Sequence, residues 1–391
     1  MPTPIRQPII ITGERQQLHY RTTKASKNQR GPKLLTALLS ILALIALVHF
    51  LIVMHTSNMQ AASPTTCSHL IRNTDYTKYI QFDPSSQQVG AIQYVDQLLG
   101  GQPAALIQVM DTQHTLDVYL YSCTMQQSTP TLTVLLKQQG LTQGTVSVSK
   151  ANTLVLGEHD AALSQETTAV LQPMQQNLYQ EYRWQHGVFT QISFPGLYPV
   201  TDRSEAETLQ EQANNGESLP WNDPQVTAEQ MAKDILQWSS GGYQEQILNN
   251  DGTTAHILLE QKYPRMDVAV TLTRLLQKNT QGLWFVTSAQ TQGITLEQSQ
   301  LSVPVTSPLS LHGTTTTTDG QATATLFDHT LTMMSSLNNT TLSITSNGSY
   351  TGSILYTNNK QTEQGLLLIK NMPPNKSSEA GQLLLTSIII G

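Results

Sequence analysis

The sequence is poor in charged and aromatic residues. Charged side chains make up 12% of the 391 residues, whereas about a quarter is typical of globular domains. Glutamine, threonine and serine take their place, and threonine and serine suit exposed strands and turns. The composition therefore predicts β structure with a neutral polar surface. Aromatic residues make up only 6%, which argues against a broad stacking surface for nucleic acid or sugar.

The common motifs of catalysis are also absent. The sequence contains no G-x-S-x-G, H-E-x-x-H or C-x-x-C motif, and no phosphate-binding or dinucleotide-binding glycine pattern. Its ten histidines are scattered, without a metal-type H-x-x-x-H pair inside an expected helix or strand. We therefore expect no enzymatic activity, no cofactor and no metal site.

The nearest approach to a carboxylate cluster is the segment GEHD, residues 157–160. Glu158 and Asp160 in this segment could join Asp111 and Asp117, which lie on earlier expected strands, in binding a cation. Carboxylates are mostly exposed in folded proteins. We therefore expect solvated side chains in a strand-end turn here.

Positive charge is concentrated at the start of the chain. Residues 1–33 carry seven basic residues and one acid, and the other 358 residues carry 14 basic and 26 acidic residues. This arm holds a single aromatic residue, Tyr20, and lacks the interleaved aromatic residues of a nucleic-acid site. The chain is thus a basic arm joined to an acidic body, and no nucleic-acid partner is expected.

Residues 34–54 predict a membrane-spanning helix. These 21 residues, LLTALLSILALIALVHFLIVM, contain no acid, lysine or arginine. As a helix they would extend about 32 Å, which matches the hydrocarbon core of a bilayer. Because the basic arm precedes them, the positive-inside rule places residues 1–33 in the cytoplasm and the body outside the cell membrane.

Two cleaved alternatives fit the sequence less well. A signal peptide has a shorter apolar core and a small-x-small cleavage site, and the segment after the span offers only Gln60-Ala61-Ala62. A lipoprotein would be lipidated at Cys67, but SPTT before it lacks the expected apolar and small residues. We therefore expect an uncleaved single-pass anchor followed by a linker, residues 55–67.

The two cysteines, Cys67 and Cys123, both fall in the outer part of the chain. Disulfides persist in oxidising compartments, and closing this loop would contribute about 4 kcal/mol at most in the chain-entropy model. The alternative is two free buried thiols, which behave as small apolar groups. Cys67 and Cys123 are therefore a disulfide candidate.

The first of three expected outer modules is a β domain, residues 68–200. It contains seven segments typical of strands, at 104–110, 116–123, 131–138, 144–149, 153–158, 179–184 and 188–194. The sequence shows no repeat of about the length of a propeller blade, so a propeller is not favoured. We expect a compact sandwich or half-barrel.

The second module, residues 201–297, predicts two helices followed by strands. Ser204 is the expected N-cap of the first helix and Thr227 that of the second. The expected strands are 254–261, 266–277 and 283–291. A helix followed by an antiparallel meander loosely resembles the cystatin-like and nuclear-transport-factor-like α+β class. Many members of that class are binding or spacer modules, and some are enzymes.

The third module, residues 298–391, predicts an immunoglobulin-like sandwich. Two runs of alternating apolar residues flank Asn347-Gly348, which is the strongest short-range signal of a hairpin and predicts a type I′ turn. Further expected strands lie at 322–333, 364–371 and 382–390. Such closely spaced short strands are typical of the immunoglobulin-like class, although the Cys…Trp…Cys spacing of antibody domains is absent.

The order of segments in this module resembles the immunoglobulin-like domain of bacterial spore-germination lipoproteins. The resemblance is carried by Ser307-Pro308-Leu309, Gly313, the strand from Gly348, QGLLLI and the final apolar strand. A threonine run at 314–318 and the segment NMPPNKSSEAG depart from the pattern. The resemblance implies an envelope binding or assembly module without catalysis, in the setting of sporulation or germination.

Together these patterns predict a single transmembrane helix followed by a β-rich multidomain ectodomain on the outside of a bacterial cell membrane. We expect it to bind or organise an envelope protein or glycan. Trp221, in LPWNDP, is the tryptophan expected to be exposed as a ligand surface. Two alternatives stay open: an envelope enzyme with a pocket in residues 201–297, and an adhesion or structural stalk. A deep, polar-lined pocket beside the helix at 227–239 would favour the enzyme.

Overall fold

The computed structural model describes residues 64–127, 129–160, 177–297, 303–334, 340–358, 362–374 and 379–391. In these ranges the chain is β-rich, with several antiparallel sheets and few helices. None of the helices in these ranges has both the length and the apolar character needed to cross a membrane. The predicted span, residues 34–54, and the basic arm, residues 1–33, lie outside the described residues.

The first part of the described chain forms two sheets over a shared apolar core. The first sheet follows α2 (Pro64–Asn73) and contains β1 (Gln87–Val89), β2 (Gln93–Tyr94), β3 (Ala104–Asp111), β4 (Thr115–Gln126) and β5 (Thr129–Thr142), with the 3-10 helices η1 (Tyr76–Lys78) and η2 (Asp96–Leu99). The second contains β6 (Thr145–Val148), β7 (Leu154–His159), β8 (Asn177–Gln185) and β9 (Val188–Ile192). Leu106 and Leu120 of the first sheet pack in one core with Leu154 and Leu156 of the second. The seven strands predicted from the sequence are all present, whereas α2 begins inside the predicted linker.

The next helices begin at aspartate residues and not at the predicted caps Ser204 and Thr227. These helices are α3 (Arg203–Asn214) and α4 (Pro224–Asp234), with the 3-10 helix η5 (Pro220–Asn222) between them. The carboxylate of Asp202 accepts a backbone N–H of the first turn of α3 at 2.9 Å, and Asp223 does the same for α4 at 2.8 Å. The sequence prediction of the caps was wrong because each helix starts earlier, α4 at a proline whose fixed φ suits the first helical position.

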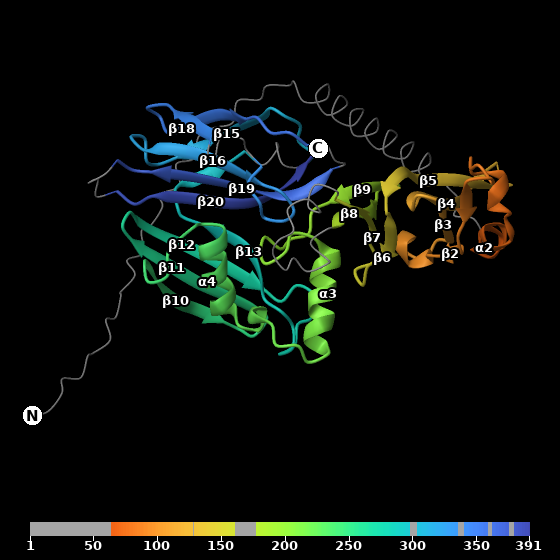
Figure 1. Cartoon of the computed structure of the whole chain (residues 1–391), viewed down its shortest axis with the longest axis horizontal. Coiled ribbons are helices and arrows are strands. Elements are labelled where there is room, and N and C mark those ends of the chain that lie inside the picture. The colour runs from red at the N-terminus through yellow and green to blue at the C-terminus, as the bar shows by residue number, and fades with distance from the viewer. Residues whose placement is uncertain are drawn as a thin grey trace, which may run out of the picture. The chain divides into compact units, whose positions relative to one another are not determined.

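The longest sheet has the strand order β10-β11-β12-β13-β20-β19-β16-β17-β18-β15-β14. Its strands are β10 (Tyr243–Asn250), β11 (Thr254–Lys262), β12 (Arg265–Thr273), β13 (Phe285–Gln290), β14 (Ile294–Leu296), β15 (Leu309–Thr315), β16 (Gln321–Phe327), β17 (Thr340–Ile344), β18 (Ser349–Ile354), β19 (Glu363–Met372) and β20 (Gln382–Ile390). Helix α4 packs on β10–β13 (Figure 1). The edge strand β10 was not predicted, because most of its side chains are exposed and it lacks a buried alternating face.

Strand β19 is buried on both of its faces. Leu366 and Leu368 face a first core, which they share with α4 and β11–β13. Leu367 and Ile369 face a second core, which they share with β15 and β18. Successive residues of a strand point to opposite sides, so the apolar run in QGLLLI serves both cores. The residues predicted as second and third modules therefore share the first core, within one compact unit, residues 61–391.

The predicted hairpin between β17 and β18 is present, but its turn is not type I′. Ile344 pairs with Tyr350, and the N–H of Gly348 donates to the carbonyl of Thr345 at 2.9 Å. A type I′ turn needs positive φ at both central residues, and only Gly348, at φ 83°, has it. Glycine is required there for a second reason, since a Cβ would lie 2.3 Å from the carbonyl oxygen of Thr315.

Truncation of Leu383 tests whether the first core is shared. Leu383 lies on β20, is fully buried and belongs to the same core as Trp238 and Trp284. We expect Leu383→Ala to lower the free energy of unfolding by about 2–5 kcal/mol and to shift the denaturant midpoint reported by tryptophan fluorescence. Leu355→Ala, at a side chain that is 70% exposed, should change it by less than about 0.5 kcal/mol. An unshifted tryptophan transition in Leu383→Ala would mean that residues 201–297 unfold independently of the C-terminal strands.

Candidate functional site

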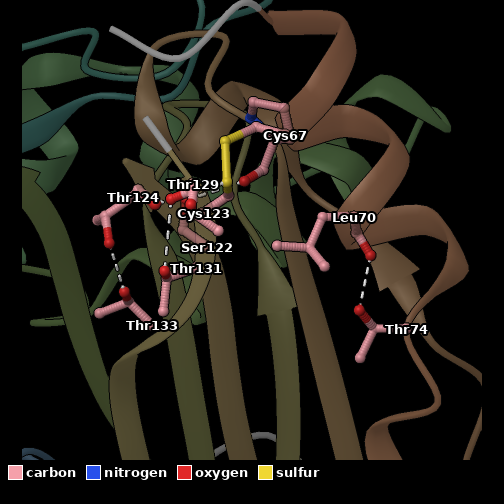
Figure 2. Close-up of a disulfide and its surroundings, with 10 residues drawn as sticks. Cys67, Leu70, Thr74, Ser122, Cys123, Thr124, Thr129, Thr131 and Thr133 are labelled. Carbon is pink, nitrogen blue, oxygen red and sulfur yellow. Dashed lines mark hydrogen bonds between the residues drawn. A yellow bond between two sulfur atoms is a disulfide. The ribbon is translucent and has the colours of Figure 1, made fainter. Parts of the chain in front are cut away.

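Cys67 and Cys123 are joined by a disulfide. Cys67 lies in α2 and Cys123 in β4, so the bond ties the helix to the first sheet (Figure 2). Beside it, the hydroxyl groups of Thr124 on β4 and Thr133 on β5 hydrogen-bond at 2.8 Å. The disulfide closes a loop across 56 positions of the sequence, which restricts the unfolded chain.

Trp221, the candidate ligand surface, is half-buried. Its ring packs edge-on against Tyr198, with ring centroids 5.4 Å apart, and contacts two of the apolar cores. Its carbonyl accepts the N–H of Trp284 at 2.8 Å. Much of the Trp221 side chain is therefore covered by its neighbours in the fold. A ligand surface at Trp221 stays a prediction.

The carboxylates named from the sequence have separate surroundings. Asp111 accepts backbone N–H groups in a turn, and the hydrogen bond from Thr115 at 2.7 Å holds its pKa below the usual value. Asp117 is buried and accepts the N–H of Gly140 at 2.9 Å. Asp160 is only 4% exposed. The expectation of a solvated turn was thus wrong for Asp160, because another part of the chain covers it.

Asp160 belongs to a buried carboxylate–histidine cluster that was not predicted. The cluster joins the end of β7, strand β8, the start of α3, the segment after β16 and the start of β19. Its members are Asp160, Glu181, Asp202, Arg203, Glu205, His329 and Glu363, all buried or nearly so. Five carboxyl groups therefore meet two basic side chains in a part of the protein that excludes water.

Two contacts fasten the cluster together. The imidazole of His329 lies between two carboxylates, with Nδ1 2.6 Å from Glu363 Oε2 and Nε2 4.0 Å from Asp160 Oδ2. Arg203 Nε donates to Glu181 Oε1 at 2.5 Å. Charge-assisted hydrogen bonds are stronger than neutral ones. Each contact joins segments that are distant in the sequence, so together they hold the second sheet, α3 and β19 in place.

Asp202 and Glu205 share a proton at neutral pH. Burial and, as the second cause, the neighbouring charge of Asp202 together raise the pKa of Glu205 to about 10. Burial also raises the pKa of Asp202. Two carboxylates in such a site do not both ionise, because like charges repel strongly at low dielectric. The bound proton lowers the negative charge that the cluster must bury.

The cluster has almost no free space. The cavity that Glu181, Asp202 and Arg203 line has a volume of about 10 Å³, which is about the space for one water molecule. Among the described residues, no group of three or more histidine, cysteine, aspartate or glutamate side chains could hold a metal ion. The arrangement can bind protons and join segments, and this small cavity has no room for a substrate.

The sequence carried little signal for this cluster. Asp202 and Glu205 have the spacing of a helix cap and the residue three positions on. Ser204 and Glu207 have the same spacing, and Ser204 was the predicted cap. Glu363 stands directly before an apolar run, and His329 follows no pattern. No family model, curated protein or solved structure matches the chain. Its function is therefore inferred from its own residues.

Removal of the disulfide should destabilise the protein. Cys67→Ser/Cys123→Ser should lower the free energy of unfolding by about 2–4 kcal/mol, because the loop is no longer closed in the unfolded chain. Denaturant titration measures this difference, and adding reductant should lower the stability of the wild type but not of the double variant. Identical gel mobility of the wild type with and without reductant would contradict the bond.

Glu205→Gln should stabilise the protein at neutral and alkaline pH. The folded state keeps on Glu205, whose pKa is about 10, a proton that the unfolded chain releases above about 4.5. Stability therefore falls as pH rises from about 4.5 towards 10, because the unfolded chain binds fewer protons than the folded state. Glutamine mimics the protonated carboxyl, so we expect a gain of about 1–3 kcal/mol at pH 8 and none at pH 4.

The control for this variant is Glu211→Gln, at an exposed position of the same helix. It should change the free energy of unfolding by less than about 0.5 kcal/mol at both pH values. The two variants are compared by denaturant titration at pH 4 and pH 8. A Glu205→Gln effect of equal size at both pH values would rule out a proton held by Glu205.

Proposed function

We propose that the chain is a membrane-anchored extracytoplasmic protein that binds or assembles components of the bacterial cell envelope and catalyses no reaction. The disulfide between Cys67 and Cys123 is the observation that carries this proposal, since such bonds persist outside the reducing cytoplasm. It agrees with the charge pattern, in which a basic arm precedes the apolar residues 34–54. The body would thus work on the outer side of the membrane.

The arrangement of the β strands supports a binding module. Strands β15 and β18 face β16, β19 and β20 across the second core, as two layers of an immunoglobulin-like sandwich would. Helix α4 on the β10–β13 meander fits the α+β class named from the sequence. The resemblance to spore-germination lipoproteins supplies the proposed setting, and the partner would be an envelope protein or a glycan.

The location of the titratable residues supports a role without catalysis. The largest group of them, the carboxylate–histidine cluster, joins five segments of the fold, and the cavity that three of its members line has a volume of about 10 Å³. Active-site acids and bases need to reach a reacting atom within hydrogen-bond distance. A closed cluster of this kind suits a scaffold that must stay assembled outside the cell.

Protease treatment of intact cells tests the topology. We expect peptides from residues 64–391 to be released and identified by mass spectrometry, and peptides from residues 1–33 to stay protected until the cells are permeabilised. Replacing Lys24, Lys27, Arg30 and Lys33 by glutamate should increase the fraction of inverted molecules, because basic residues beside a span favour the cytoplasm. Protection of the whole body in intact wild-type cells would overturn the proposal.

A further inference from the structure

A second, open pocket lies at the end of α4. Its volume is about 420 Å³, within the range of about 300–1,000 Å³ that is typical of ligand pockets. Thr325 and Phe327 of β16 lie beside Leu368 and Lys370 of β19 on one face of the sheet and form its floor. The residues after α4 and after β16, namely Ile235, Gln237 and Met333, complete its lining.

Among the described residues that line this pocket, Lys370 is the only charged one. Its ammonium donates to the carbonyl of Leu236 at 3.1 Å, which uses one of its three N–H groups. In the described part of the chain no carboxylate forms an ion pair with it, and burial lowers its pKa. The carbonyl end of a helix carries about half a negative charge, so the full charge of the ammonium leaves the pocket positive.

The backbone beside the pocket is held in an unfavourable conformation. Gln237 lines the pocket with φ 61°, and Leu331, two residues before Met333, has φ 65°. Side chains other than glycine, asparagine and aspartate rarely adopt this left-handed region. The position after a helix is one where glycine is strongly preferred. Strain of this kind is concentrated at binding and active sites, and here it places an amide side chain at the pocket.

We propose that this pocket binds a small monocarboxylic acid, with the carboxylate on Lys370 and Gln237 and the apolar part against Phe327, Met333 and Leu368. A carboxylate would give the half-buried ammonium of Lys370 the counter-charge that the described part of the chain does not supply. The single cation favours a monoanion over a phosphate or a dicarboxylate. The inference goes beyond the proposed function and does not depend on the membrane anchor, so a failed topology experiment would leave it intact.

Calorimetric titration of the purified full-length protein with hexanoate tests this proposal. We expect saturable binding at one site, and binding at least about tenfold weaker in Lys370→Met, which keeps an unbranched apolar side chain and removes the ammonium with its charged hydrogen bond. Hexan-1-ol, which has the same chain without the charge, should also bind at least about tenfold more weakly. If the full-length protein is kept in detergent, some hexanoate partitions into the detergent. This contribution is the same for all variants in one buffer, so it cancels when their binding is compared.

Three further variants separate binding from folding. Lys233→Met removes a half-buried lysine of α4 that lies outside the pocket lining and pairs with Glu229 at 2.7 Å, and it should leave hexanoate affinity unchanged. Met333→Trp should block the pocket while Lys370 stays in place, which tests the site even if Lys370→Met does not fold. Gln237→Gly should raise the melting temperature, because glycine relieves the strained backbone, and weaken hexanoate binding.

Two results would overturn the proposal. One is the absence of saturable hexanoate binding to the folded wild-type protein. The other is equal binding of hexanoate and hexan-1-ol, or equal binding by wild type and Lys370→Met, which would show an apolar hollow without a carboxylate site.

Discussion

The burial of β19 on both faces is the constraint on which the rest of the structure depends. From Glu363 to Ile369 this strand has no solvent-exposed face on which a polar side chain can be hydrated. The two cores meet on alternate residues of this strand, with Leu366 and Leu368 in one and Leu367 and Ile369 in the other. A shift of one residue in register would exchange these faces, so polar residues on β19 also fix its position.

Two polar side chains of β19 illustrate this. Glu363 is fully buried and pairs with His329 at 2.6 Å. Asn371 is also fully buried, and its amide donates to Thr315 Oγ1 and to the carbonyl of Thr317, each at 2.7 Å. A buried polar group without a partner costs about 1–3 kcal/mol, a large fraction of the about 5–15 kcal/mol by which a domain is stable. These pairings therefore specify one register among several that would bury the same leucines.

The sequence predicts the local elements of this structure better than its long-range contacts. Alternation in 104–110 and 116–123 identifies β3 and β4, because side-chain period is a property of neighbouring residues. The shared core and the carboxylate–histidine cluster depend on contacts between residues as distant as Asp160 and His329, and no local pattern records them. Strand β10 was missed for the opposite reason: pairing with β11 holds it in the sheet, although its own side chains stay exposed.

The carboxylate–histidine cluster and the Lys370 pocket differ in how their cations are neutralised. Arg203 is neutralised by Glu181 at 2.5 Å, and the guanidinium of Arg274 lies 4.6 Å from the ring centroid of Trp284, where the π face stabilises a cation. Lys370 has a carbonyl partner and an open space beside it. A charge buried without a counter-charge is costly unless something outside the chain supplies one. The cluster therefore pairs Arg203 with a carboxylate of its own chain, whereas the Lys370 pocket has an electrostatic reason to take up an anion.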